Sequence, residues 1–207
     1  MTTNTTRHER ARQVENDYFR RRDAELLERA AHATRRAALE QAHAVELNAL
    51  SDALGVHDVL LVRALHDAGF RAGRTALLDW MPAIDVAWVD DLDMHERQAL
   101  RLRIGADPRA DEGLGLITEF LFVRPDEALL ETVREVLKRQ LAAADPATRL
   151  ERLRDILGRC EEVGVASGGS WLVGAVSADE RLRIAAIRSK LGDADTDILS
   201  ASYEFPH

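Results

Sequence analysis

Hydrophobic residues along most of this 207-residue chain recur every three or four positions, the spacing that places them on one face of an α-helix. Strand patterns are nearly absent, because β-branched and aromatic residues are sparse and no stretch alternates apolar and polar residues for long. Ala, Leu, Arg and Glu dominate, and all four favour helix. The pattern therefore predicts an all-α protein: a compact helical bundle with a long N-terminal helix projecting from it.

The N-terminal part, residues 1–50, differs in pattern from the rest of the chain. Residues 7–50 contain neither Pro nor Gly and mix helix-forming residues with closely spaced charges, which predicts one long helix with at most one break. Its apolar residues form a stripe too thin for a helix that is packed into a globule. We therefore expect a charged arm that pairs with another protein or with a second copy of the chain. The residues expected to bind that partner are Tyr18, Phe19, Leu26 and Leu27.

Residues 51–192 are expected to form a helical body, since Gly and Pro divide them into shorter amphipathic segments. The segment 74–89 is apolar nearly all round, which predicts the central core helix, with a bend at Pro82. Residues 193–207 are expected to form an acidic, flexible tail. The expected helices of the body are 57–68, 74–89, 93–105, 111–122, 126–141, 147–165 and 177–191.

Charge and cysteine content narrow the function and the location. The formal net charge of −8 falls entirely in residues 51–207, because residues 1–50 carry nine Arg against eight Asp or Glu. An acidic body disfavours nonspecific binding to nucleic acid. The single cysteine, Cys160, rules out an intramolecular disulfide and lies on an apolar stripe, which favours a buried structural role in a reducing compartment. No apolar run is long enough to cross a membrane, so we expect a cytoplasmic protein whose membrane contact is only indirect.

Two turns of the chain share one plan, in which a helix ends, the chain turns, and a new helix opens with a pair of capping residues. The pair is Asp93 and Glu96 in the first turn, and Ser177 and Glu180 in the second. At this spacing each side chain can accept a hydrogen bond from the unpaired backbone amide of the other residue. Each pair therefore predicts the start of a helix.

These turns carry a resemblance to a known family. The first follows the pattern of an apolar helix, Ala, Asp-Gly, then Ser or Asp with Glu three residues later, through Ala87, Asp90, Asp93 and Glu96. Residues 74–192 thereby resemble the all-helical tellurite-resistance TerB-like family. Asp91 stands where that pattern has Gly, so the turn must hold a side chain in a left-handed backbone conformation, which Asp tolerates. The second turn follows the pattern through Ala166, Ser167, Gly168, Ser177 and Glu180.

The resemblance implies an acidic helical module in stress-related or membrane-associated complexes, with metal binding suggested for some members and no established enzymatic reaction. Asp90, Asp91, Asp93 and Glu96 place four carboxylates within seven residues, and their oxygens suit a divalent cation such as calcium or magnesium. Capping already accounts for Asp93 and Glu96. A metal site is therefore the alternative to a purely structural turn.

A second acidic segment lies in the tail and is also a candidate metal site. Asp193, Asp195, Asp197 and Glu204 match positions one, three, five and twelve of a calcium loop, but Ile198 stands where that loop requires Gly. The departure favours an acidic tail over a calcium loop.

No cluster in the sequence has the spacing of a catalytic site. The histidines do not pair at helical spacing, and the Gly-rich segment 167–174 lacks the ending of a phosphate-binding loop. Trp171, within that segment, fits either a partner anchor or a plug of the core. We expect a noncatalytic interaction or scaffold module that needs no cofactor. The alternative is a metal-responsive binding protein, and an enzyme is the third choice.

Overall fold

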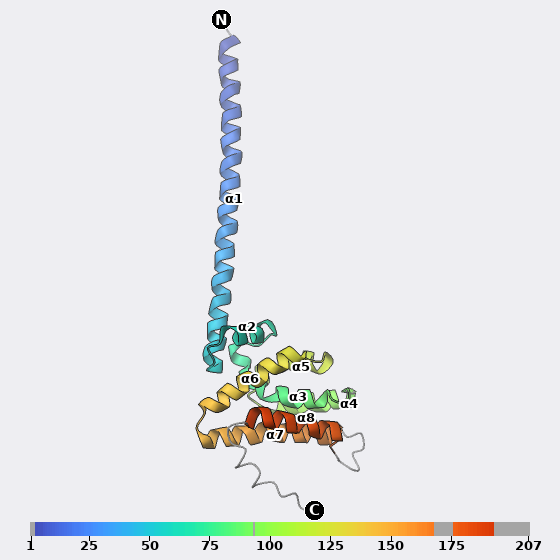
Figure 1. Ribbon diagram of the computed structural model, residues 1–207. Helices are drawn as coiled ribbons and strands as arrows, with labels where there is room; N and C mark the ends of the chain where they lie inside the picture. The colour runs from blue at the N-terminus through green and yellow to red at the C-terminus, as the bar shows by residue number, and fades with distance from the viewer. Residues whose placement is uncertain (1–2, 93, 168–175, 193–207) are drawn as a thin grey trace, which may run out of the picture. The chain divides into compact units, whose positions relative to one another are not determined.

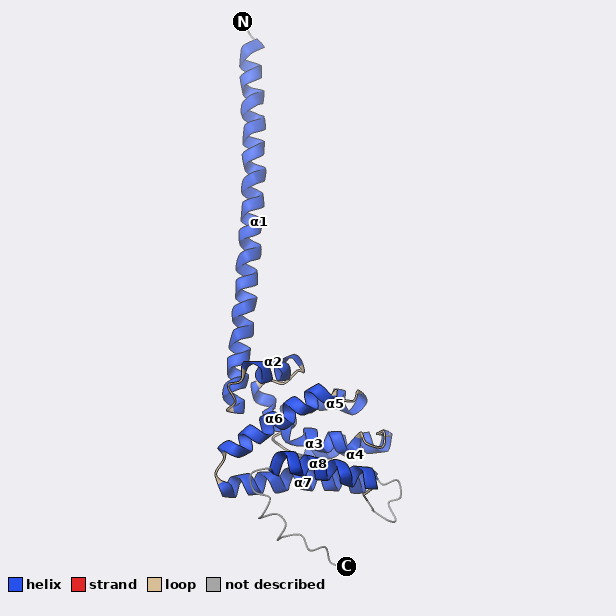
Figure 2. Cartoon of the chain, viewed as in Figure 1, coloured by secondary structure: helices blue, strands red, loops and turns tan. Residues whose placement is uncertain are grey.

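The computed structural model describes residues 3–92, 94–167 and 176–192, and in this part of the chain the fold is all-α, as predicted. Figure 2 shows helices joined by loops, with no strand in the described ranges. No helix in these ranges is both long enough and apolar enough to cross a membrane. The chain divides into two compact units, Met1–Val45 and Glu46–His207.

Helix α1 (Thr3–Leu54) is continuous, without the break that the sequence left open (Figure 1). The absence of interior Pro and Gly permits this length, and an ion pair one turn apart, Arg36 to Glu40 at 2.9 Å, supports it. Gly55 then adopts a φ of 63°, the left-handed conformation that commonly ends a helix. The helix therefore ends where local chemistry allows it.

The C-terminal end of α1 belongs to the core of the second unit. Leu50 is fully buried and Leu54 is 3% exposed, while Leu47 packs against the same core. The Nε2 of Gln140 also donates a hydrogen bond of 2.7 Å to the carbonyl oxygen of Leu54. The sequence placed the division of the chain at residue 50, whereas the compact units meet between Val45 and Glu46.

The centre of the second unit is formed by two successive helices of different kinds. The sequence predicted one bent α-helix over 74–89, and this prediction is wrong: residues Ala72–Trp80 form the 3₁₀-helix η1, and the α-helix α3 spans Met81–Ala87. Pro82 lies in the first turn of α3, where its missing amide hydrogen costs nothing, so it begins a new helix instead of bending a continuing one. All seven residues of α3 are buried.

Helices α6 (Glu127–Ala143), α7 (Pro146–Ser167) and α8 (Ala178–Gly192) all contact α3 (Figure 1). The remaining helices are α2 (Val59–Asp67), α4 (Met94–Ala106), η2 (Asp111–Gly113) and α5 (Leu114–Phe122). The single helix expected over 111–122 is thus a 3₁₀ turn followed by an α-helix. Gly113 joins the two, and a Cβ at this position would lie 2.1 Å from a methyl carbon of Leu77.

Aspartates set the start of three helices. Asp58 accepts a hydrogen bond from the amide of Leu60 before α2, and Asp126 accepts one of 2.7 Å from the amide of Leu129 in α6. Asp145 accepts a bond of 3.1 Å from the amide of Thr148 in α7. Each bond satisfies a backbone donor that the first turn of a helix leaves without a partner.

Candidate interaction surfaces

The first candidate surface is the part of α1 that belongs to the first unit. Every described side chain from Arg12 to Val45 is exposed, apart from the half-buried His43. Leu26 and Leu27 are 52% and 71% exposed. The other large apolar side chains exposed along this stretch are Tyr18, Phe19, Leu39 and Val45. A contiguous patch of exposed apolar side chains is typical of a surface that binds another protein, so the positions of these residues around the helix decide which of them belong to one.

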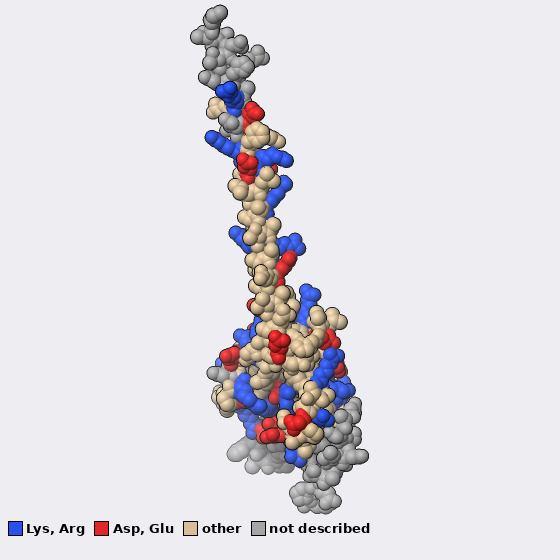
Figure 3. Space-filling model, turned by 90° about the vertical axis from the view of Figure 1, so that its left-hand side faces the viewer, with Lys and Arg blue, Asp and Glu red and all other residues tan. Residues whose placement is uncertain are grey.

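One broad face of this stretch carries no charge. At 3.6 residues per turn, the charged residues between 24 and 45 all fall within a sector of roughly 140°. The rest of the circumference holds mostly Ala, together with Leu26, Leu27 and Val45. Figure 3 shows a tan band along α1 that is bordered by blue and red. This charge-free face is much broader than the thin stripe of apolar residues that the sequence indicates.

A seven-residue repeat underlies this face. Arg22, Arg29, Arg36 and His43 are spaced seven residues apart, and a pair of small apolar residues follows each of the last three. A repeat of seven keeps the same residues facing a partner helix along a left-handed supercoil. An apolar stripe does not reveal this repeat, because Ala contributes little hydrophobicity. The pairs are Ala30–Ala31, Ala37–Ala38 and Ala44–Val45.

Tyr18 and Phe19 form an aromatic pair near the far end of the described side chains of α1. Their ring centroids lie 5.7 Å apart with an interplanar angle of 74°, an edge-to-face arrangement. The two residues are 53% and 52% exposed. Large, half-exposed aromatic side chains of this kind are enriched among the residues that dominate binding energies at protein interfaces.

The acidic turn after α3 has the backbone that the sequence predicted. Asp91 takes a φ of 60°, the only positive φ of a non-glycine residue in the described ranges, so it fills the place where the TerB-like pattern has Gly. The side chains of Asp90 and Asp91 are exposed, while Leu92 is 4% exposed and anchors the turn in the core.

The metal hypothesis for this turn stays a prediction. Asp93 and the side chain of Glu96 lie outside the described residues. Among the described side chains, no three His, Cys, Asp or Glu residues gather as a ligand set. Asp193, Asp195, Asp197 and Glu204 of the tail fall outside the described residues as well.

The second capping pair is confirmed. The amide of Ser177 donates to Oε2 of Glu180 at 2.7 Å, and the amide of Glu180 donates to Oγ of Ser177 at 3.2 Å. Glu180 is only 1% exposed. Helix α8 begins at Ala178, the residue after Ser177, so this reciprocal pair caps its first turn. Trp171, which precedes this turn, lies outside the described residues.

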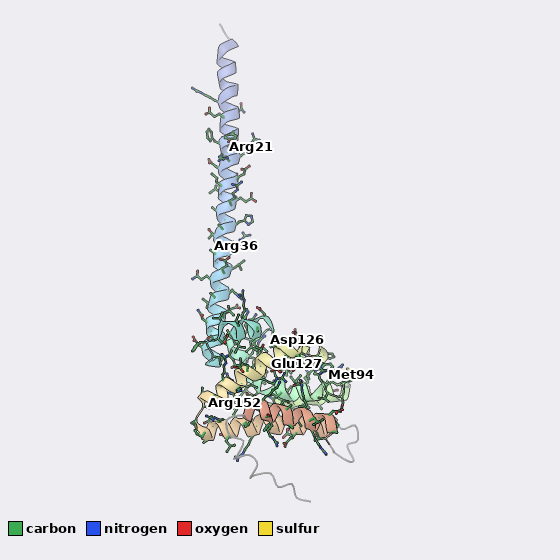
Figure 4. The ribbon with its side chains drawn as sticks, viewed as in Figure 1. Arg21, Arg36, Met94, Asp126, Glu127 and Arg152 are labelled. Carbon is green, nitrogen blue, oxygen red and sulfur yellow. The ribbon has the colours of Figure 1, made fainter. Side chains whose placement is uncertain are left out.

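A buried carboxylate in α3 binds two arginines that are distant in sequence. Asp85 is 2% exposed and accepts two hydrogen bonds from Arg183 in α8, at 2.7 and 2.9 Å. Arg134 in α6 approaches the same carboxylate at 3.4 Å and also bonds Glu127. Burial raises the pKa of Glu127, but hydrogen bonds from Arg134 and Arg183 outweigh it and hold that pKa below its usual value. Figure 4 shows Glu127 at the start of α6.

A second buried carboxylate, Asp79 in η1, is held by α7 in the same manner. Nη2 of Arg152 donates to Asp79 at 2.8 Å and to Gln140 at 2.7 Å. Arg159 lies with its guanidinium carbon 4.6 Å from the ring centroid of Trp80. A polar hollow of about 500 Å³ opens beside Asp79 and Arg152. These groups are already paired with one another, which assigns them to holding η1 and α7 together.

A larger and mainly apolar hollow lies between α2, α5 and the start of α6. Its volume is about 700 Å³, within the range of ligand and anchor pockets. Asp126, which Figure 4 shows at the start of α6, is one of the residues that line this hollow. The sequence did not predict this hollow, because residues from three separate helices form it. Its apolar lining includes Ala64, Ala68, Phe120, Val123, Pro125 and Leu129.

Comparison with known proteins does not identify the chain. It matches no protein-family model, no curated protein and no solved structure. The likeness to TerB-like proteins therefore rests on the two turn patterns alone.

Cys160 is buried in α7, as the sequence predicted, and we expect its thiol to be inert in the folded protein. The side chain is fully buried, and burial raises the pKa of the thiol far above its usual value, so almost no thiolate forms near neutral pH. A thiol reagent such as 5,5′-dithiobis(2-nitrobenzoate) should react with the native protein only as fast as it unfolds. An Ala186→Cys variant, with a thiol at an exposed position of α8, should react at once and serves as the control. Rapid reaction of native Cys160 would contradict its structural role.

Proposed function

We propose that this chain is a noncatalytic scaffold protein that self-associates through α1. The observation that carries the proposal is the charge-free face between residues 24 and 45, with Leu26 and Leu27 exposed on it. The second unit supplies its own core and includes the end of α1 from Glu46 onward. The first unit thus has no described core of its own, and its apolar side chains lie at the surface.

Pairing of two charge-free faces supplies the burial that α1 lacks. Transfer of one Leu side chain from water to an interface contributes about 1.5–3 kcal/mol. Two Leu residues on each of two chains therefore contribute roughly 6–12 kcal/mol, against an association cost of about 4–15 kcal/mol. The Ala pairs add packing because small side chains let two helix backbones approach closely. The balance favours a reversible dimer over a permanent one.

The TerB-like pattern supports a place for this scaffold in stress-related complexes of the cytoplasm. Two features of the structure fit that pattern: the left-handed Asp91 and the reciprocal bonds between Ser177 and Glu180. The buried Cys160 fits a reducing compartment. The assembly would then act by bringing copies of the helical body together.

Sedimentation velocity of the full chain over a wide concentration range tests this proposal. We expect a reversible monomer–dimer equilibrium, and the double variant Leu26→Gln, Leu27→Gln should weaken it by at least about tenfold, because each Leu contributes more than 1.4 kcal/mol. Gln is a good helix former, so the variant keeps α1 helical, which circular dichroism verifies.

Leu39→Gln is the matched control for that variant. Leu39 is 68% exposed on the same helix but lies within the charged sector, so its replacement should leave the dimer unchanged. A full chain that stays monomeric at every concentration would refute the proposal. Equal weakening by the Leu39 variant would show that the charge-free face is not the interface.

A further inference from the structure

We propose that the apolar hollow of one copy receives the Tyr18–Phe19 pair of a second copy, with Arg20, Arg21 and Arg22 bound at its acidic rim. This inference rests on the proposed self-association and names the surface of the second unit that takes part in it. The helices that form the hollow are α2, α5 and α6, and all of them lie in the second unit.

The hollow has the chemistry of an aromatic anchor site. Its lining is mainly apolar, and Phe120 and Leu129 are half-buried in it, so their remaining surface is open to a ligand. Val123 is 71% exposed at its edge. A volume of about 700 Å³ is large enough for two aromatic side chains that arrive from one helix. Such a hollow buries the two rings of an edge-to-face pair more fully than a flat surface would.

Charge favours this occupant over an uncharged helix. The hollow is lined by three carboxylates, those of Asp67, Glu119 and Asp126, against one cation, Arg124. The aromatic pair is followed directly by three arginines in sequence. A surface with an excess of negative charge steers a cationic segment towards itself and selects its orientation. The aromatic pair and the arginines are adjacent on α1, and the apolar floor and acidic rim are adjacent on the hollow.

A second copy of the chain is the occupant because both halves of the contact are present in every molecule. Two copies can exchange their arms, so that each Tyr18–Phe19 pair enters the hollow of the other, which gives a closed two-fold assembly. One aromatic pair in one hollow is a small contact of the weak, transient kind. Two reciprocal contacts, joined by the paired charge-free faces of α1, act together and raise the affinity.

Disulfide trapping between two populations of the full chain tests this docking. One population carries Phe19→Cys and the other carries Ala128→Cys, a residue that lines the hollow. After mixing under mild oxidation, we expect a covalent dimer that contains one chain of each kind. Cys160 is fully buried and does not compete. Ala186→Cys in place of Ala128→Cys is the matched control, since both alanines are exposed on helices of the second unit.

A charge variant separates this inference from the proposed function. Val123→Arg adds a cation at the edge of the hollow and should weaken the dimer at least tenfold in sedimentation velocity, whereas Leu182→Arg, at a position 69% exposed on α8, should not. If Leu26→Gln, Leu27→Gln dissociates the dimer but Val123→Arg does not, the self-association stands and the docking is wrong. Equal trapping at residues 128 and 186 also overturns the docking. A double variant that carries both Phe19→Cys and Ala128→Cys gives a third test. If its disulfide forms only within one chain and not between two chains, the docking is also wrong.

Discussion

A fragment of residues 46–207 should unfold at nearly the same temperature as the full chain, whereas a fragment of residues 56–207 should not fold. The first cut falls at the boundary between the two compact units. The second cut also removes Leu50 and Leu54, which are 0% and 3% exposed. Loss of a buried Leu side chain costs about 2–5 kcal/mol, so the loss of two approaches the whole stability of a typical domain, about 5–15 kcal/mol.

Contacts besides these two side chains disappear with the second cut. Glu46 contacts Nε2 of the buried His66 at 3.0 Å, and the carbonyl of Leu54 accepts the hydrogen bond from Gln140. Near-ultraviolet circular dichroism of the buried Trp80 and Trp88 reports the loss of tertiary packing directly. Two outcomes would contradict the division of the chain: an unfolded 46–207 fragment, or a 56–207 fragment as stable as the full chain.

The local features of the fold were the ones that the sequence predicted well. Ser177 and Glu180 open α8, because this capping signal acts through backbone groups within a few residues. Asp91 could be predicted as left-handed for the same reason. Cys160 could be predicted as buried because it lies on the apolar stripe of its own helix.

The errors came from features that depend on distant residues or on the exact place of a helix break. Hydrophobic spacing alone does not distinguish a bent helix from a 3₁₀-helix followed by an α-helix, so the role of Pro82 was misjudged. The sequence divided the chain at residue 50, because helical spacing does not show that Leu47 and Leu50 pack against the core of the second unit. The broad face of α1 was missed because its main signal is an absence of charge.

The candidate sites show the same limit more strongly. The apolar hollow brings together Ala64, Phe120 and Leu129, and no motif joins these positions in the sequence. The partners of Asp85 lie 49 and 98 residues away along the chain. A single sequence shows that α3 contains one acidic residue on an apolar helix, but not which cations neutralise it. That pairing decides how much the residue contributes to stability.

Asp85→Asn should lower the free energy of unfolding of the full chain by about 3–5 kcal/mol, the usual cost of removing one partner of a buried ion pair. The side chain of Arg134 is only 6% exposed, so it cannot turn to water when Asp85 loses its charge. Arg183 donates one hydrogen bond to each oxygen of the same carboxylate, and at least one of these is lost because the amide nitrogen of Asn cannot accept. Asn keeps the size of the side chain, so the effect reports charge and hydrogen bonding and not a cavity. Urea unfolding followed by circular dichroism measures the change.

Two further variants identify the cause of that loss. Glu162→Gln breaks the ion pair between Arg103 and Glu162, whose side chains are 49% and 59% exposed. This variant should lower the free energy of unfolding by no more than about 1 kcal/mol. After Asp85→Asn, Arg134 keeps Glu127 as a partner but loses its buried one, so its charge is only partly compensated. Adding Arg134→Met removes that charge and should restore part of the lost stability. The opposite outcome is that the two single losses add: the double variant is then less stable than Asp85→Asn by as much as Arg134→Met lowers stability on its own. In that case the two residues act independently. The network around α3 would then contribute packing, and its charges would not be what holds α6 and α8 against the central helix.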